Sequence, residues 1–411
     1  GTLSAGLDRY MRWRTVDGET ILSEREELAL NTLTDGLLNR AVLLDLLRWF
    51  VVFEDDGKGP IKKAAGYHQF HAVRKAMASI LSARYDDGKG GVIWHTQGSG
   101  KSLLMTFLAG RAMHLKELEN PTVLVLTDRN DLDNQLYTTF GRCRGLLGED
   151  PTQADSIDDL KTLLNRQVGG IVFSTVQKFR PGRGENFPEL TDRSNVIVMV
   201  DEAHRTQYGF DAKMDQATGE VRHGLAHHLR SALPNAVYVA FTGTPVELVG
   251  ANTRSVFGDY IDVYDIAQAV EDGATVPIYY EGRVARVEIA DDVQESLDEE
   301  FDEATEALEE DEATATAKKW SQIEKLVGAG PRLDAVVEDI LTHFDARLEA
   351  IDGKAMIVCM SRRICVEVYD RIVAAHPDWH SDTDETGAVK VVMTGNATDP
   401  LPFQQHIRSK T

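Results

Sequence analysis

The sequence has 411 residues, 42% of them hydrophobic, which is enough for two or three domains with buried cores. Its formal net charge of −22 argues against a surface that wraps nucleic acid throughout, although a local DNA-binding groove remains compatible with it. No apolar run approaches the roughly 20 residues of a membrane span. The three cysteines have neither paired nor metal-ligand spacing. We therefore expect a cytoplasmic protein without membrane contact.

The first 65 residues are expected to form a helical segment or linker before the main fold. Apolar residues recur at intervals of three and four between positions 37 and 51, which is typical of an amphipathic helix. The pattern predicts mostly helix from residue 3 to about residue 53, and a turn over residues 54–60. A further helix is predicted from about His68 to Arg84.

Five short apolar runs follow, each ending in polar residues. They predict strands at residues 91–94, 122–127, 170–174, 196–200 and 237–241. Continuous apolar runs indicate strands that are buried on both faces. Their alternation with helices predicts an α/β fold with a parallel sheet over residues 66–262, which would bind its ligand at the carboxyl ends of the strands.

The pattern changes after residue 262. Strand-like runs are predicted at residues 278–281, 283–289, 355–360 and 389–393, and helix at residues 291–319 and 332–348. We expect an incomplete second α/β unit over residues 263–411, with an acidic helical insertion at about residues 290–348. The acidic stretch is interpreted as a solvated helical surface, with subunit docking or DNA mimicry as the alternative.

The segment from His95 to Ser102 has the spacing of a phosphate-binding P-loop between a strand and a helix. Glycines allow the sharp turn that points backbone N–H groups at a phosphate. Lys101 is predicted to contact the β- and γ-phosphates of ATP, and Ser102 to ligate Mg²⁺. His95 stands where the motif usually has glycine. The expected nucleotide-binding residues of this loop are Thr96, Gln97, Gly98, Ser99, Gly100, Lys101 and Ser102.

Two adjacent acids end the predicted strand at residues 196–200. Asp201 is predicted to hold Mg²⁺, and Glu202 to act as the general base that activates water. The catalytic residues would thus be Glu202, Lys101 and Asp201. His204 has two interpretations, coupling to the next strand or simple packing. The residues expected to couple nucleotide state to the next strand are His204, Thr242, Gly243 and Thr244.

Gln69 lies upstream of the P-loop and is a candidate for adenine recognition. A glutamine amide is both donor and acceptor, so it can pair with N6 and N7 of adenine. The alternative is an ordinary surface glutamine on a helix.

Polar side chains after the predicted strands are candidates for contacts to DNA phosphates, which position a strand without reading its sequence. The alternative for each is a solvated loop. Arg362 is predicted to lie at the end of a strand in the second unit. The candidates are Thr127, Arg129, Ser174, Thr175, Lys178 and Arg362.

Taken in order, these motifs resemble those of superfamily 2 helicases and translocases. More closely, the chain resembles the restriction (R) subunit family of type I restriction enzymes, over nearly its whole length. The segments that carry this resemblance are residues 13–19, 43–53, 94–102, 127–132, 201–205, 241–245 and 392–395.

The resemblance implies two RecA-like lobes, the second one partial, that use ATP and Mg²⁺. It also implies a complex with modification and specificity subunits that pulls double-stranded DNA and cuts it at a distance. The specificity subunit of that family reads the target, which agrees with the lack of a base-reading helix here. The alternatives are another superfamily 2 helicase or remodelling translocase, and a non-catalytic nucleotide-binding scaffold in which Lys101→Ala would leave function intact.

Two departures from the family indicate a fragment. Residues 1–65 show no cluster of acids and lysine of the kind that the family's nuclease domain carries, and the first residue is Gly1. The motifs that supply an arginine to the γ-phosphate would follow Thr411. Because such an arginine contributes several powers of ten in rate, the sequence predicts nucleotide binding with slow turnover.

Overall fold

The computed structural model divides into two units, Gly1–Ile278 (unit 1) and Tyr279–Thr411 (unit 2), which are described separately. The residues that the structure describes are 10–22, 29–55, 59–128, 130–179, 187–203, 213–214, 221–222, 225–244, 247–248, 251–283, 323–325, 327–383, 385–395 and 399–407.

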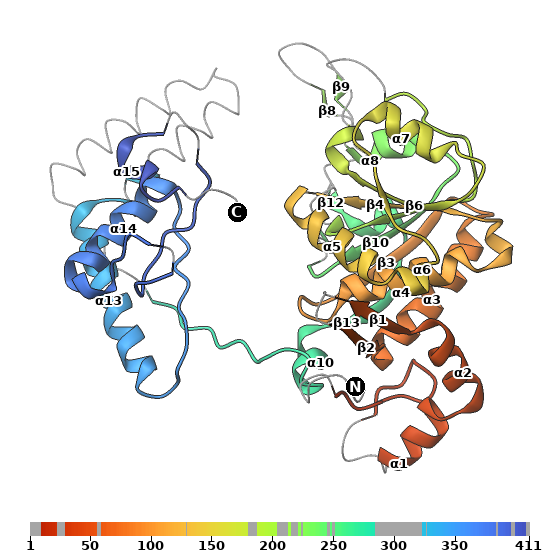
Figure 1. Cartoon of the computed structure of the whole chain (residues 1–411), viewed down its shortest axis with the longest axis horizontal. Helices are drawn as coiled ribbons and strands as arrows, with labels where there is room; N and C mark the ends of the chain where they lie inside the picture. The colour runs from red at the N-terminus through yellow and green to blue at the C-terminus, as the bar shows by residue number, and fades with distance from the viewer. Residues whose placement is uncertain are drawn as a thin grey trace. The chain divides into compact units, whose positions relative to one another are not determined.

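Unit 1 is built on a seven-stranded sheet in the order β13-β3-β10-β7-β4-β6-β5, and every neighbouring pair is parallel (Figure 1). Its strands are β3 (Lys89–His95), β4 (Thr122–Thr127), β5 (Thr152–Gln153), β6 (Gly170–Thr175), β7 (Val196–Val200), β10 (Val237–Thr242) and β13 (Tyr260–Tyr264). The predicted α/β class and the five predicted strands are confirmed. The edge strands β5 and β13 were not predicted, because an edge strand is half-exposed and lacks a continuous apolar run.

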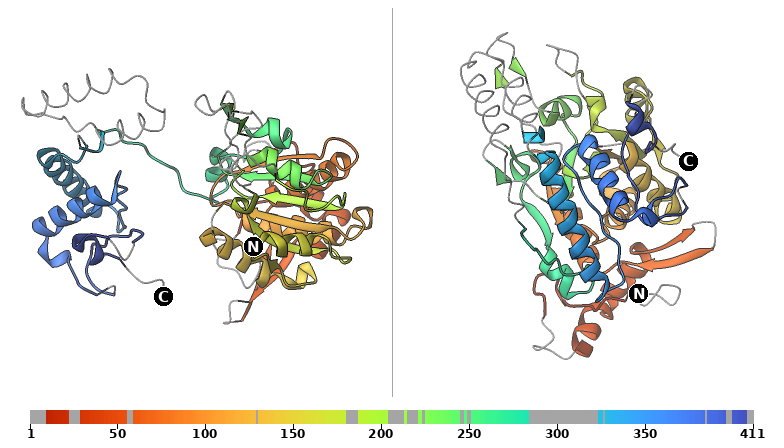
Figure 2. Two further views of the ribbon diagram at one scale, coloured as in Figure 1. Left: turned by 90° about the horizontal axis from the view of Figure 1, so that it is seen from above. Right: turned by 90° about the vertical axis from the view of Figure 1, so that its left-hand side faces the viewer.

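Helices cover both faces of this sheet (Figure 2). Alternate strand residues point to opposite faces, so Val123 and Val125 of β4 lie in one apolar cluster while Leu124 and Leu126 lie in the other. The helices on the first face are α3 (Tyr67–Ala83), α4 (Lys101–Met113), α5 (Asn130–Arg142) and α6 (Arg144–Leu147). Those on the second face are α7 (Ile157–Leu164), α8 (Leu225–Ala232) and α9 (Thr253–Phe257).

The remaining elements of unit 1 are short. The 3-10 helices are η3 (Lys116–Leu118) and η4 (Val176–Phe179), and the α-helix after β13 is α10 (Ile266–Glu271). Two short antiparallel strand pairs follow β7 and β10 in the chain, and they are β8 (Lys213–Met214) with β9 (Val221–Arg222) and β11 (Glu247–Leu248) with β12 (Ala251–Asn252).

The amino-terminal segment, predicted to be mostly helical to about residue 53, contains short helices and a strand pair. Its elements are α1 (Ala29–Thr32), the π-helical turn η2 (Leu33–Leu37), α2 (Arg40–Trp49), β1 (Val51–Asp55) and β2 (Pro60–Ala64). The strands β1 and β2 form an antiparallel hairpin. The helix ends before Val51 because valine and phenylalanine favour strand, and because the buried Phe50 packs on Phe70 and Phe107.

Unit 1 extends past the predicted boundary at residue 262. Strand β13 pairs with β3, so it belongs to the sheet, and α10 follows it within the same unit. The described residues before residue 66 also belong to unit 1.

Unit 2 is held together by helices in its described part. They are α13 (Gly330–Leu348), α14 (Arg362–Ala375), the 3-10 turn η6 (Pro377–Trp379) and α15 (Leu401–Gln404). Leu333 and Val337 of α13 pack against Ile364, Val368 and Ile372 of α14. The predicted helix at residues 332–348 is confirmed. The acidic stretch at residues 291–319 lies outside the described residues.

The strands predicted for unit 2 are wrong where the structure describes them. Residues 278–281, 355–360 and 389–393 carry no strand assignment, and most of residues 283–289 lie outside the described part. Val358 is 82% exposed and Val392 is 93% exposed. An apolar run becomes a strand only when another strand supplies hydrogen-bond partners, and these segments have none assigned. No helix in the described ranges combines the length and apolar character that a bilayer crossing requires.

Candidate nucleotide-binding and hydrolysis site

Three loops of unit 1 meet at the carboxyl edge of the sheet. Strand β10 lies between β3 and β7, so the loops that follow these three strands are neighbours. The P-loop follows β3, the acidic pair follows β7, and the Thr242–Thr244 turn follows β10. The sheet therefore brings together the three motifs that were predicted to act on ATP.

The P-loop needs glycine at two positions. Gly98 and Gly100 both have φ of +83°, a left-handed conformation that strains residues with a side chain. Close packing adds a second reason at Gly100, where a Cβ atom would lie 2.7 Å from Nε2 of Gln69. Helix α4 begins at Lys101, so its unsatisfied N–H groups and its positive dipole end face the loop.

The ammonium of Lys101 lies among all three loops. Its Nζ atom donates to the carbonyl oxygens of His95, at 3.2 Å, and Thr96, at 3.5 Å. A Cβ atom on Gly243 would lie 3.1 Å from the same Nζ. Burial lowers the pKa of Lys101, while the charges of Glu202 and Asp201 raise it. The lysine thus sits where a cation can meet terminal phosphates.

The acidic pair carries an unusual backbone. Glu202 has a φ of +46°, and a left-handed conformation costs a residue other than glycine about 1–2 kcal/mol. Such strain often accompanies functional sites. The N–H of Glu202 donates to Oδ1 of Asp201 at 3.0 Å. The sequence predicted the two acids but gave no signal for this conformation.

Electrostatics at the acidic pair favour a bound cation. Burial first and the charge of Glu202 second raise the pKa of Asp201 to about 6, against the opposing charge of Lys101. Mg²⁺ prefers hard oxygen ligands and usually combines one or two protein ligands with phosphate and water oxygens. Within the described residues no group of three or more His, Cys, Asp or Glu side chains could hold a metal. The Mg²⁺ ligation predicted for Ser102 and Asp201 stays a prediction, in which a bound nucleotide would complete the coordination.

The turn after β10 is held by one hydrogen bond within the turn and one from β3. The N–H of Thr244 donates to Oγ1 of Thr242 at 3.1 Å, and Nε1 of Trp94 donates to the carbonyl of Gly243 at 3.2 Å. The indole thereby ties this turn to β3. His204 lies outside the described residues, so its coupling role stays a prediction.

Gln69 is not a surface glutamine, because its side chain is 6% exposed. Its Oε1 accepts from the N–H of Gly66 at 3.0 Å and caps helix α3. Its Nε2 donates to the carbonyl of Gly100 at 3.0 Å. The amide therefore braces the P-loop, and its pairing with adenine stays a prediction.

The structure places the candidate DNA contacts of unit 1 in different environments. Thr127 and Ser174 are buried at the ends of β4 and β6, and within the described structure their hydroxyl oxygens have no hydrogen-bond partner. Thr175, paired with Thr127 across the sheet, is also buried, and Lys178 lies on η4. The solvated-loop alternative is thus wrong for the three hydroxyl residues. Arg129 lies outside the described residues.

The prediction that Arg362 lies at the end of a strand is wrong. It is the first residue of helix α14 in unit 2. Its guanidinium binds the carboxylate of Asp399 through two hydrogen bonds of 2.7 and 3.0 Å. The guanidinium also donates a hydrogen bond to the carbonyl oxygen of Thr394. The arginine therefore stabilises unit 2 through these contacts, and a contact to DNA phosphate stays a prediction.

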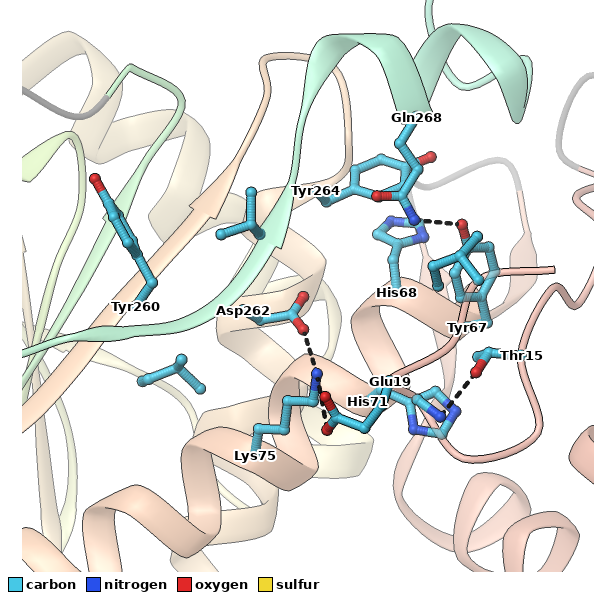
Figure 3. Close-up of a pocket in the computed structure, with 14 residues that line it drawn as sticks. Thr15, Glu19, Tyr67, His68, His71, Lys75, Tyr260, Asp262, Tyr264 and Gln268 are labelled. Carbon is cyan, nitrogen blue, oxygen red and sulfur yellow. Dashed lines mark hydrogen bonds and ion pairs between the residues drawn. The ribbon is translucent and has the colours of Figure 1, made fainter. Parts of the chain in front are cut away.

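The sequence did not reveal the side chains that hold the P-loop from β13 and α3. These residues come from separate parts of the chain, and the one available signal was His95 in place of the usual glycine. Figure 3 shows part of this group around a cavity of about 200 Å³. Its members are His68, Lys75, His95, Asp262 and Tyr264.

The comparisons with known proteins found an ATPase family and type I restriction subunits. A family model described as SWI2/SNF2 ATPase matches residues 68–314. The type I restriction enzyme HindI endonuclease subunit of Haemophilus influenzae is 46% identical over 418 residues, which cover 100% of this chain and 38% of that protein. The "Putative type I restriction enzyme MjaIXP endonuclease subunit" of Methanocaldococcus jannaschii is 38% identical over 434 residues, with the same two coverages.

The chain thus spans 38% of the length of these two curated relatives. Among solved structures, the ATP-dependent Type ISP restriction-modification enzyme LlaBIII bound to DNA is 18% identical, with a TM-score of 0.35. That match covers 51% of this chain and 16% of the other.

Proposed function

The chain belongs to the SWI2/SNF2 ATPase family and is homologous over its whole length to part of type I restriction endonuclease subunits, and we propose that it is the ATP-driven DNA translocase portion of such a subunit. The observation that carries this proposal is the position of Lys101, whose ammonium lies among the P-loop, the acidic pair and the Thr242–Thr244 turn. These three elements correspond to binding, hydrolysis and coupling.

In this proposal the P-loop holds the phosphates through its backbone N–H groups and the amino end of α4. Lys101 neutralises charge on the terminal phosphates, and its buried position strengthens that attraction. Glu202 takes a proton from the attacking water, since a carboxylate next to the phosphate site is suited to general base catalysis. Its strained backbone is then the cost of directing that carboxylate into the site.

Ser102 and Asp201 would hold Mg²⁺, which when bound supplies charge neutralisation between the phosphates. The raised pKa of Asp201 supports this role, because a neighbouring cation would relieve the repulsion between the two acids. Gln69 would present its remaining donor and acceptor capacity to adenine while it braces the loop.

Hydrolysis would drive the movement of double-stranded DNA across unit 1 and a second motor lobe formed by residues of unit 2. The modification and specificity subunits of a type I complex are the expected partners. The sequence relationship to restriction subunits supports this assignment over another superfamily 2 translocase. The left-handed backbone conformation of Glu202 favours a hydrolase over a non-catalytic nucleotide-binding scaffold, because strained residues cluster at active sites.

The test is ATP binding and turnover by the chain with Mg²⁺, with and without duplex DNA. We expect Glu202→Gln to keep the affinity for a fluorescent ATP analogue and to lower turnover by at least about a hundredfold, as removal of a general base does. Lys101→Ala should weaken binding itself. Exposed Glu117→Gln is the control. Absence of nucleotide binding by the unaltered chain would contradict the proposal, as would unchanged turnover in Glu202→Gln.

A further inference from the structure

The first residue of the P-loop is fixed by its side chain. His95 is fully buried, and its Nε2 lies 2.8 Å from Oδ2 of Asp262 on β13. A carboxylate only accepts hydrogen bonds, so Nε2 carries a hydrogen and donates it. Burial lowers the pKa of His95, which agrees with a neutral ring. The glycine that is usual at this position could form no such contact.

Asp262 has a partner for each of its two oxygens. Oδ1 accepts from Nζ of Lys75 at 3.1 Å, and that lysine also lies 3.3 Å from the carboxylate of Glu19 (Figure 3). The carboxylate of Asp262 is 12% exposed. Because its two partners lie on α3 and at the end of β3, Asp262 joins both elements to β13.

The loop beyond His95 is held from two sides. On the side of β13, the N–H of Thr96 donates to the carbonyl of Tyr264 at 2.9 Å. On the side of α3, Nε2 of His68 lies 3.1 Å from the carbonyl of Ser99. The rings of His68 and Tyr264 stack with centroids 4.1 Å apart, so the two sides contact each other. The loop is therefore fixed at Thr96 and at Ser99 to one connected group.

His95 also links this group to the lysine. Its backbone carbonyl accepts from Nζ of Lys101 at 3.2 Å, while its ring is held by Asp262. A ring fixed at its far end restricts the χ1 and backbone angles of its own residue. The carbonyl that receives the ammonium is thereby restricted as well.

We propose that Asp262 is a positioning residue for Lys101, which it holds in place for the terminal phosphates by fixing His95. The inference rests on the proposed function, because it requires that Lys101 binds a nucleotide. Among the described residues, Asp262 bonds to Lys75 and His95 and not to Lys101, so its effect on the ammonium passes through His95.

Asp262→Asn changes this contact with little change in shape. The amide presents one acceptor oxygen and one NH₂ group that only donates, so its two ends cannot accept from both Lys75 and His95. If its oxygen faces the lysine, its NH₂ group faces Nε2, and the ring must move its hydrogen to Nδ1. Nδ1 is buried and has no partner within the described structure, so this arrangement leaves a buried donor unsatisfied.

The experiment measures the affinity of the whole chain for a fluorescent ATP analogue with Mg²⁺ in four proteins: unaltered, Asp262→Asn, His95→Gly and the double variant. We expect each single change to weaken binding by about tenfold, and the double variant to bind like His95→Gly within about twofold. His95→Gln, which keeps a side-chain donor, should recover most of the affinity that His95→Gly loses. The matched control is Asp259→Asn, a carboxylate 84% exposed just before β13.

The outcomes separate the two proposals. If the unaltered chain does not bind the analogue, the proposed function fails. If it binds and either Asp262→Asn or His95→Gly binds equally well, the positioning role is overturned, and additive losses in the double variant overturn it too. Should Asp262→Asn not fold, as judged by its thermal unfolding, the comparison of His95→Gly with His95→Gln decides, and equal affinities of those two would overturn the proposal.

Discussion

The two units contain similar apolar runs with different outcomes. In unit 1 the run at residues 170–174 lies within β6, whose residues are buried between α5 on one face and α7 on the other. In unit 2 the run at residues 355–360 has no assigned strand partner, and Val358 is 82% exposed. An apolar run therefore forms a strand only where neighbouring strands pair with it and helices cover it.

The largest expected effect comes from placing a charge in each run. Val172→Asp puts a carboxylate at a fully buried position of β6, between two packed layers, and should lower the free energy of unfolding by at least about 4 kcal/mol. Val358→Asp changes an exposed side chain and should change it by less than about 0.5 kcal/mol. Urea unfolding of both variants measures the difference. A loss of similar size in Val358→Asp would mean that residue 358 is covered in the protein.

A second difference concerns pH, because buried histidines with lowered pKa values lie in unit 1. Burial lowers the pKa of His68 to about 4, and burial likewise lowers that of His71 to about 4. The unfolded chain therefore binds more protons than the folded chain between pH 6.5 and pH 4. Stability should fall as pH falls through this window, by roughly 3 kcal/mol for His68 alone.

Hydrogen exchange between pH 7.5 and pH 4.5 can assign this loss to unit 1. His68→Asn should flatten the dependence, whereas His380→Asn, at a side chain 44% exposed in unit 2, should not. Asp201 acts in the opposite direction, because its pKa is raised to about 6 and the folded state then gains protons first as pH falls. In an Asp201→Asn background the free energy of unfolding should therefore fall more steeply as the pH falls. A flat profile in the unaltered chain would contradict the neutral, buried histidines.

The P-loop shows how far sequence alone could go. Its spacing predicted Lys101, Gly98 and Gly100 correctly as one loop, because these residues are neighbours in the chain and their chemistry is local. The contact between His95 and Asp262 joins residues 167 positions apart, and no local pattern encodes it. The same holds for the boundary of unit 1, since pairing of β13 with β3 depends on the folded sheet. The strands predicted in unit 2 failed for the related reason that strand partners are not a local property.

The smallest effect compares one tyrosine hydroxyl from each unit. In unit 1, Tyr264 donates to Oδ2 of Asp272 at 2.8 Å, and the carboxylate of Asp272 has no exposure. In unit 2, the hydroxyl of Tyr369 lies 2.7 Å from Nδ1 of His380, a side chain 44% exposed. Water can replace the second contact more easily than the first.

Tyr264→Phe should therefore cost about 1.5–3 kcal/mol of unfolding free energy, the range for a hydrogen bond to a charged group, and Tyr369→Phe about 0.5–1.5 kcal/mol. The hydroxyl of Tyr67 and the guanidinium of Arg14 still bind Asp272 when Tyr264 is changed, so the carboxylate stays paired and the loss stays moderate. Paired urea unfolding curves measure both. The ring of Tyr264 also stacks on His68 beside the P-loop. If Tyr264→Phe lowers the free energy of unfolding no more than Tyr369→Phe does, the Tyr264 ring supports the loop by packing alone, without its hydroxyl.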